Sequence, residues 1–298
     1  MKLVSCLHDD RTLLGVMVNE QIVVPALMPQ APATFDDMLA LIDAGPEAMR
    51  QLGGLVAGAP AQATLPLNST PLAAPIPRPR QNVICLGWNY RDHVEEAADL
   101  AKQKLPEHPV VFTKAVSSVT GPYDDIPFDG DVSAQIDWEV ELGVVIGKPG
   151  RGIAKADALK HVFGYTVIND VSARDLQFRH QQFYVGKSLD GACPMGPCIV
   201  TADEISDPQA LDLRCQVNGK PKQDSNTRHQ IFDVATTISI LSQGMTLQAG
   251  DVIATGTPSG VGFTREPPEF LAPGDVVECE VESIGHLRNE VVQIRPGY

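Results

Sequence analysis

Acidic side chains alternate along a short segment with strand character. Asp137, Glu139 and Glu141 occupy every second position, with large apolar residues between them. Alternate residues of a β-strand point to the same face, about 6.6–6.8 Å apart. The apolar run 144–146 follows, which indicates a central strand whose acidic face is enclosed. Enclosed carboxylates repel one another and raise one another's pKa unless a cation neutralises them.

A third carboxylate is available at Asp170, where the strand-like run 162–170 ends. Carboxylate oxygens alone suit Mg²⁺ or Mn²⁺, with Ca²⁺ as a further candidate, and do not suit Zn²⁺. The alternative interpretation is an ordinary solvated strand face, because alternation of this kind often marks one. We predict a divalent-metal site formed by Glu139, Glu141 and Asp170.

A second pair of reactive side chains lies in a segment with helix character. His93 and Glu96 are three residues apart, a spacing that places both on one face of a helix. Glu96 can then orient the His93 ring and raise its basicity. Such a pair can activate water or move a proton. Because Glu95 and Asp99 lie close by, a solvated helix face is the alternative.

Three familiar catalytic signatures are incomplete. Gly186-Lys187-Ser188 resembles the end of a phosphate-binding loop, but Gln181 stands where that loop requires glycine. Pro258-Ser259-Gly260 resembles a nucleophile elbow, but Thr257 and Val261 replace its two glycines. No HExxH motif occurs. These absences argue against a P-loop NTPase, a serine hydrolase and a zinc peptidase.

The length, charge and apolar content of the chain exclude further classes of protein. The chain has 298 residues, 43% of them hydrophobic, enough for one large domain with a small appendage. A net charge of −14 argues against a nucleic-acid surface, because phosphate binding needs clustered Lys and Arg. No apolar run approaches the ~20 residues of a membrane helix, and Asp9, Asp10 and Arg11 interrupt the first apolar stretch. We expect a cytoplasmic protein without nucleic-acid or membrane partners.

Residues 1–75 are predicted to form a small α+β domain. Short apolar segments typical of strands lie at 2–7, 12–18 and 21–24. Thr34 and Asp36 can cap a helix that ends at Gly45, and a second helix is expected over 46–56.

The remaining residues, 76–298, are predicted to form the catalytic domain. The proline-rich segment 69–82 is expected to be a semi-rigid linker that leads into it. Strand-like segments dominate, and Asn218-Gly219 predicts a hairpin turn. Helices are expected over 89–103 and over 233–243, the latter capped by Asp233 and ended by Gly244. Because regular βαβ alternation is missing, we predict a mixed, largely antiparallel β architecture.

The ordered motifs of the chain resemble the fumarylacetoacetate hydrolase superfamily, in particular its bacterial two-domain members. The resemblance covers residues 82–294, after a variable N-terminal domain. It rests on Glu139-x-Glu141, NDVSARDLQ at 169–177, GKSLDG at 186–191, PMGP at 194–197 and TGTPSGVG at 255–262. It implies a β-rich, mixed α/β fold, namely a mixed β-sandwich roll with a small N-terminal α+β domain.

The resemblance also implies roles for individual residues. Glu139, Glu141 and Asp170 match the family's metal ligands, and the metal would chelate a 2-oxo acid and stabilise its enolate. Lys187 matches a lysine beside the substrate oxygens, with a surface lysine as the alternative. Thr257 lies in a glycine-rich turn that can bind a carboxylate.

Four further residues match pocket positions of the family. Arg174 and Gln177 match polar residues that line the pocket, and a structural ion pair is the alternative for Arg174. His93 and Glu96 match the lid helix of the smaller members. The expected substrate is therefore a small 2-oxo acid held between these residues and the metal.

The implied activity is a metal-dependent hydrolase that cleaves a C–C bond of a short 2,4-dioxo acid of the acylpyruvate or fumarylpyruvate type. Water activated by His93 and Glu96 would attack the distal carbonyl, and the pyruvate enolate would depart. The alternatives are 2-hydroxyhepta-2,4-diene-1,7-dioate isomerase or a hydratase, oxaloacetate decarboxylase and ureidoglycolate lyase. A non-catalytic metal-binding protein is a remote alternative. We expect a homodimer, since two-fold contacts are the commonest assembly.

Overall fold

The computed structural model describes residues 1–29, 31–97 and 104–294. Most strands join one large mixed sheet with the order β4-β3-β2-β1-β14-β12-β11-β17-β6-β7. These strands are β1 Lys2–His8, β2 Arg11–Val18, β3 Gln21–Val23, β4 Thr64–Pro66, β6 Val83–Gly87, β7 Val110–Lys114, β11 Val140–Ile146, β12 Val162–Asn169, β14 Cys193–Thr201 and β17 Val252–Ala254. Neighbouring strands along this path are antiparallel except β17 and β6.

A second sheet has the order β16-β15-β18-β19-β9. Its strands are β9 Ile126–Phe128, β15 Asp212–Val217, β16 Lys220–Asn226, β18 Val276–Val281 and β19 Gly285–Gln293. The short strands are β5 Leu72–Ala73, which pairs with β1, β8 Val119–Thr120, which pairs with β14, and the ribbon of β10 Ile136–Asp137 with β13 Ser172–Ala173.

Helices are short except in the N-terminal unit. The α-helices are α1 Met38–Ala57, α2 Arg91–Glu96, α4 Arg174–Arg179, α5 Tyr184–Lys187 and α6 Val234–Leu241. The 3-10 helices are η1 Pro25–Leu27, η2 Ala33–Phe35, η3 Ala61–Ala63, η4 Val116–Ser118, η5 Lys155–His161, η6 Ala202–Glu204 and η7 Thr227–His229. Within the described residues, no helix has both the length and the apolar character needed to span a membrane.

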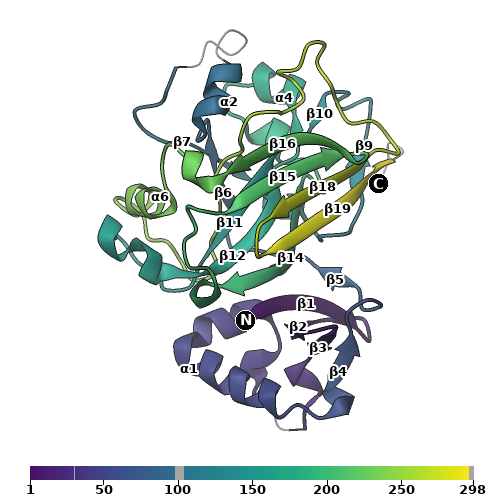
Figure 1. Cartoon of the computed structure of the whole chain (residues 1–298), viewed down its shortest axis with the longest axis vertical. Helices are drawn as coiled ribbons and strands as arrows, with labels where there is room; N and C mark the ends of the chain where they lie inside the picture. The colour runs from purple at the N-terminus through teal and green to yellow at the C-terminus, as the bar shows by residue number, and fades with distance from the viewer. Residues whose placement is uncertain (30, 98–103, 295–298) are drawn as a thin grey trace.

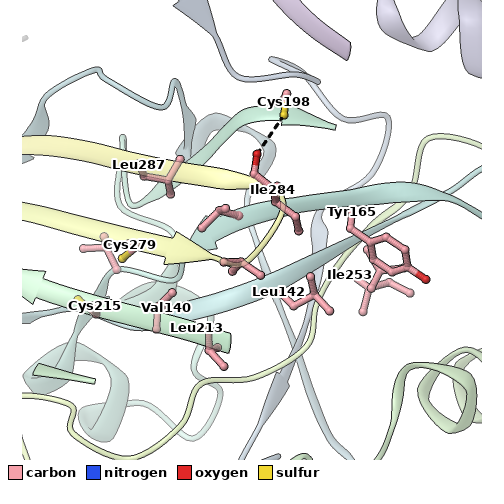
Figure 2. Close-up of a cluster of buried hydrophobic side chains, with 14 of the residues drawn as sticks. Val140, Leu142, Tyr165, Cys198, Leu213, Cys215, Ile253, Cys279, Ile284 and Leu287 are labelled. Carbon is pink, nitrogen blue, oxygen red and sulfur yellow. Dashed lines mark hydrogen bonds between the residues drawn. The ribbon is translucent and has the colours of Figure 1, made fainter. Parts of the chain in front are cut away.

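The central strand predicted from residue 137 onward is confirmed from Val140, where β11 begins; Asp137 belongs to β10, and Trp138 and Glu139 lie between the two strands. Every residue of β11 is buried, and β12 and β17 flank it. Val140 and Leu142 lie in one hydrophobic core with Leu213 and Cys215 of the second sheet (Figure 2). Because strand residues alternate, Glu141 points away from this core. The two packed sheets form the β-rich mixed α/β fold that the sequence predicted.

Strands β1 to β4 and helix α1 lie together at one end of the molecule, opposite α2 and α4 (Figure 1). Strand β1 pairs with β14 through Lys2↔Val200 and Leu3↔Ile199, so the N-terminal unit extends the large sheet. The division of the chain between residues 75 and 76 stays a prediction.

The cap predicted for the first helix is wrong. Neither Thr34 nor Asp36 caps it; instead Asp37 has extended backbone and its side chain accepts a hydrogen bond from Ala40 N. The preceding 3-10 helix η2 ends at Phe35, and Asp36 follows it with helical backbone, so Asp37 rather than Asp36 has the extended backbone of a helix cap. Gly45, with a φ of 72°, kinks α1 between the two predicted helical segments.

The proline-rich segment 69–82 is packed against the protein rather than acting as a spacer. Leu72 and Ala73 form β5 on β1, and Ala74 and Ile76 are buried. Proline favours extended backbone, so apolar residues between prolines can be buried without helix or turn.

Two local predictions in the catalytic domain are confirmed. Asn218 and Gly219 both have positive φ between β15 and β16, the geometry of a type I′ hairpin turn. Asp233 caps α6 by accepting a hydrogen bond from Thr236 N at 2.6 Å. Within the described part of the helix predicted over 89–103, the structure has α2, Arg91–Glu96; residues 98–103 of that prediction lie outside the described residues.

Candidate active site

Three buried carboxylates converge where β11 begins and β12 ends. The two strands are antiparallel with Val140 opposite Asn169, so Glu139 precedes one strand beside Asp170, which follows the other. Asp170 N donates to the Glu139 carbonyl at 2.9 Å. Oxygens of Glu139, Glu141 and Asp170 all lie within 4.8 Å of one another. The structure therefore brings the three predicted metal ligands together.

Three buried cations surround these carboxylates. Lys187 Nζ lies 2.8 Å from Glu139 Oε2 and 2.9 Å from Asp170 Oδ2. Arg174 Nη2 lies 2.7 Å from Glu139 Oε1, and Lys114 Nζ lies 2.7 Å from Asp170 Oδ1. Because all five side chains are almost fully buried, these contacts form a network with little solvent screening.

The charges in this network separate the pKa values of the two glutamates. Burial opposes ionisation of Glu139, but the positive charges of Lys187 and Arg174 lower its pKa to about 2. Burial raises the pKa of Glu141 well above its ordinary value, and the negative charges of Asp170 and Glu139 add to this effect. The two nearby carboxylates also raise the pKa of Lys187, although burial opposes the charge. Glu141 is thus the carboxylate that most lacks a cation.

The donor set fits a divalent cation. In this network four buried carboxylates face three buried cations, so one negative charge remains when all are ionised: Asp137, Glu139, Glu141 and Asp170 against Lys114, Arg174 and Lys187. The three candidate ligands all offer carboxylate oxygens, the ligand atoms that Mg²⁺ and Mn²⁺ prefer. We assign Glu139, Glu141 and Asp170 as the residues that would hold such an ion.

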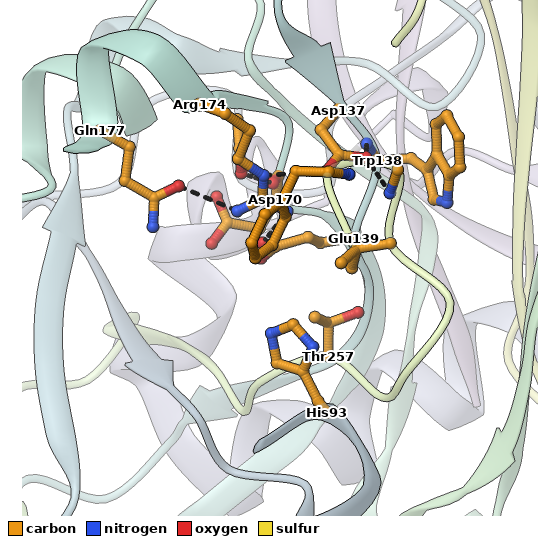
Figure 3. Close-up of polar contacts among 12 residues, drawn as sticks. His93, Asp137, Trp138, Glu139, Asp170, Arg174, Gln177 and Thr257 are labelled. Carbon is orange, nitrogen blue, oxygen red and sulfur yellow. Dashed lines mark hydrogen bonds and ion pairs between the residues drawn. The ribbon is translucent and has the colours of Figure 1, made fainter. Parts of the chain in front are cut away.

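Arg174 forms the structural ion pair that was the alternative for it, and it also lines the cavity of the site, while its contact with a substrate stays a prediction. Its Nε donates to Asp137 Oδ2 at 2.8 Å and its Nη1 donates to Gln177 Oε1 at 2.9 Å (Figure 3). Asp137 also accepts hydrogen bonds from the backbone N–H groups of Gly262 and Phe263. Asp137 therefore positions Arg174 and stands apart from the three metal-ligand candidates, although it shares their alternation in sequence.

The predicted dyad forms on α2. His93 Nδ1 lies 2.7 Å from Glu96 Oε1, and Glu96 Oε2 accepts a hydrogen bond from Gly260 N at 2.8 Å. The His93 ring stacks on Trp88, with centroids 4.9 Å apart. These contacts restrict both the rotation and the position of the imidazole, and His93 is only 5% exposed. The alternative of a solvated helix face is wrong for this pair.

The glycine-rich turn after β17 supports the site mainly through its backbone. Gly256 N donates to Glu141 Oε2 at 2.7 Å. The Thr257 hydroxyl donates to the Val140 carbonyl at 2.9 Å and accepts from Gln223 Nε2 at 2.8 Å. The hydroxyl therefore holds the turn against β11, and the predicted carboxylate contact of Thr257 stays a prediction.

A cavity lies between His93 of the dyad and Glu139 of the carboxylate cluster. Figure 3 shows the His93 ring directed toward Glu139. The cavity is lined by charged and polar residues together with aromatic and apolar ones: Leu86, Gly87, Trp88, His93, Phe112, Glu139, Arg174, Gln177, Phe183, Lys187 and Thr257. A mixed lining of this kind is typical of small-molecule sites.

Sequence reasoning missed two residues that complete the site. Lys114 is the last residue of β7 and is fully buried. Trp88 follows β6 and has a φ of 57°, unusual for a bulky residue and typical of strained functional positions. A lysine at the end of an otherwise apolar strand is the one cue that could have drawn attention to Lys114.

Residues 82–292 match the family model described as fumarylacetoacetate (FAA) hydrolase C-terminal. The chain belongs to the fumarylacetoacetate hydrolase family. It is 50% identical over 225 residues to oxaloacetate tautomerase YisK of Bacillus subtilis (strain 168), covering 76% of this chain and 74% of the relative. This membership confirms the resemblance inferred from the motifs.

Solved structures support the same assignment over the whole chain. A fumarylacetoacetate hydrolase from psychrophilic Exiguobacterium antarcticum has a TM-score of 0.81 and 42% identity, covering 99% of this chain and all of that one. Maleylpyruvate hydrolase from Sphingobium sp. SYK-6, solved in complex with manganese(II) and pyruvate, has a TM-score of 0.78 and 30% identity, with the same coverage. The chain is thus similar to family members named for different reactions, and it is an enzyme of this family.

Proposed function

We propose that this protein is a divalent-metal-dependent tautomerase that interconverts the enol and keto forms of oxaloacetate. The observation that carries the proposal is the cavity that His93 lines together with Glu139 and Lys187. Half of the aligned residues are identical to those of a Bacillus subtilis oxaloacetate tautomerase, which supports this reaction over C–C hydrolysis.

Tautomerisation moves one proton between oxygen and carbon. In the enol-to-keto direction, the C2 hydroxyl loses its proton, the C2–O bond becomes a carbonyl and C3 gains a proton. Ionised Glu96 can only accept, so it holds the hydrogen on His93 Nδ1 and leaves Nε2 to exchange a proton with the substrate. A positioned group of this kind contributes about 10²–10⁴-fold to a proton transfer.

The polar side of the cavity binds and orients the diacid. Lys187 Nζ supplies a positive charge near the C2 oxygen, where negative charge develops during proton transfer. Arg174 donates to the Gln177 carbonyl, which leaves the Gln177 amide as a donor for a substrate carboxylate. A divalent ion held by Glu139, Glu141 and Asp170 would supply Lewis acidity toward the 2-oxo acid group.

Hydrolysis of an acylpyruvate is the second candidate. The maleylpyruvate hydrolase relative is named for this type of reaction, and a histidine paired with a carboxylate can equally activate water. The aromatic side of the cavity, formed by Trp88, Phe112 and Phe183, would accept the larger distal group of such a substrate.

The test compares the candidate reactions on one preparation with added Mg²⁺ or Mn²⁺. Freshly dissolved enol-oxaloacetate is followed by the loss of its ultraviolet absorbance, against the spontaneous rate in buffer and against enzyme treated with a chelator. We expect a metal-dependent acceleration without release of CO₂. Rapid cleavage of acylpyruvates with no effect on the oxaloacetate enol would overturn the proposal in favour of the hydrolase.

A further inference from the structure

Lys187 lies at the centre of the carboxylate cluster rather than beside it. Its Nζ bridges Glu139 Oε2 and Asp170 Oδ2 at 2.8 and 2.9 Å. Both residues belong to the group that would hold a divalent ion. One ammonium and one metal ion are therefore directed at the same two side chains.

The other oxygens of these two side chains are held from outside the cluster. Glu139 Oε1 pairs with Arg174, which is itself fastened to Asp137. Asp170 Oδ1 pairs with Lys114, which is fully buried and also donates to the backbone. Because these outer contacts are anchored, neither carboxylate can rotate freely to offer its second oxygen.

On Glu139 and Asp170, the oxygens left for an ion are therefore the two that Lys187 bridges, while Glu141 offers a third carboxylate. Mg²⁺ binds oxygen at about 2.0–2.1 Å and demands near-octahedral geometry. An ammonium between the same oxygens uses one lone pair on each of them and places a positive charge close to where the ion would bind. Charge repulsion between the ammonium and the ion therefore drives the breaking of at least one of the two Lys187 contacts.

A released Lys187 has a favourable place to go. The side chain lines the cavity, and its Nζ lies 5.0 Å from the centre of the Phe112 ring, within cation–π distance. Small movement toward this ring carries the ammonium away from the carboxylates while it stays charged and buried. The same movement turns it toward a ligand in the cavity.

We propose that Lys187 and the divalent cation compete for Glu139 and Asp170, so that metal binding itself delivers the Lys187 ammonium to the substrate. The inference rests on the metal site of the proposed function. It makes Lys187 a stabilising counter-ion in the metal-free protein and a substrate ligand in the loaded protein. Metal binding then places both positive charges, that of the divalent ion and that of the Lys187 ammonium, in position for the substrate.

Lys114 provides a matched control. It also pairs with Asp170, is equally buried and carries the same charge, but it contacts the outer oxygen Oδ1 and the Val171 carbonyl. Replacing either lysine with methionine removes one positive charge next to Asp170. Only Lys187→Met also removes a competitor for the inner oxygens.

The experiment measures Mn²⁺ binding by calorimetry, and thermal unfolding with and without Mn²⁺, for wild type, Lys187→Met and Lys114→Met. We expect Lys187→Met to bind Mn²⁺ more tightly than Lys114→Met by roughly tenfold or more, because no charge-assisted hydrogen bond must be broken. We also expect Lys187→Met to be destabilised mainly without metal, and to recover on adding it. Lys187→Gln, which keeps one donor, should fall between wild type and Lys187→Met and serves if methionine prevents folding.

Equal changes in affinity for the two methionine variants would overturn the competition, because they would reflect lost charge alone. Unchanged or weaker binding in Lys187→Met or Lys187→Gln would overturn it as well. If wild type binds no Mn²⁺, the metal assignment of the proposed function fails instead, which separates the two ideas.

Discussion

Replacing Glu96 with glutamine tests whether an oriented His93 performs the chemistry. Glu96 uses both carboxylate oxygens as acceptors, one for His93 Nδ1 at 2.7 Å and one for Gly260 N at 2.8 Å. Glutamine has the same shape but offers one acceptor and one donor group. The glutamine side chain can therefore accept only one of the two hydrogen bonds and must present its NH₂ group to the other partner.

Either orientation of the new amide damages the dyad. If its NH₂ group faces His93, Nδ1 must become the acceptor and the hydrogen moves to Nε2, so the base is lost. If it faces Gly260, a partly buried N–H loses its partner at a cost of about 1–3 kcal/mol, and α2 is held less firmly. We expect kcat/KM to fall by about 10²–10⁴-fold, which corresponds to roughly 2.7–5.4 kcal/mol of transition-state stabilisation.

The matched control is Glu95→Gln, which removes the same charge from an exposed neighbour on α2. Both variants are assayed for enol-oxaloacetate tautomerisation at saturating Mn²⁺, together with Mn²⁺ affinity. We expect Glu95→Gln to match wild type and both variants to bind Mn²⁺ normally. If Glu96→Gln is as active as Glu95→Gln, the orientation of His93 by Glu96 is irrelevant to the reaction.

Glu141→Gln should remain folded, because the amide oxygen can still accept a hydrogen bond from Gly256 N. Its Mn²⁺ affinity in calorimetry should fall by roughly 100-fold or more, since the loss of even an outer-sphere partner costs about 10–100-fold in metal affinity. An affinity equal to that of wild type would refute the ligand assignment. Although burial opposes it, hydrogen bonds from Lys155 and Thr236 lower the pKa of Asp233. Its capping contribution should therefore be present above the ordinary carboxyl pKa of about 4 and disappear as the pH falls below it. Accordingly, Asp233→Ala should cost about 1 kcal/mol in urea unfolding at pH 7 and progressively less in acid; a cost that does not change with pH would contradict this. Light scattering at micromolar concentration should give the mass of a homodimer, and a monomeric mass would refute that expectation.

Much of the site could be read from local sequence patterns. Strand periodicity placed Glu139 and Glu141 on one face, and the antiparallel neighbour β12 delivers Asp170 beside them. The three-residue spacing of His93 and Glu96 likewise predicted a pair on one helix face, and the two side chains are hydrogen-bonded in the structure. These features depend on repeats of two to four residues, which the chain carries whatever its tertiary contacts are.

The tertiary structure decided which charges neutralise the carboxylates and which contacts hold the turns. Lys114 pairs with Asp170 from 56 residues away, although three strands separate β7 from β12 in the large sheet. Asp137 follows the same alternation as its acidic neighbours, yet it binds Arg174 and two backbone N–H groups instead of joining them. The two-residue period of a strand specifies which face each side chain points to. The partner of a buried charge depends instead on the order of the strands and on which other segments are buried next to that charge.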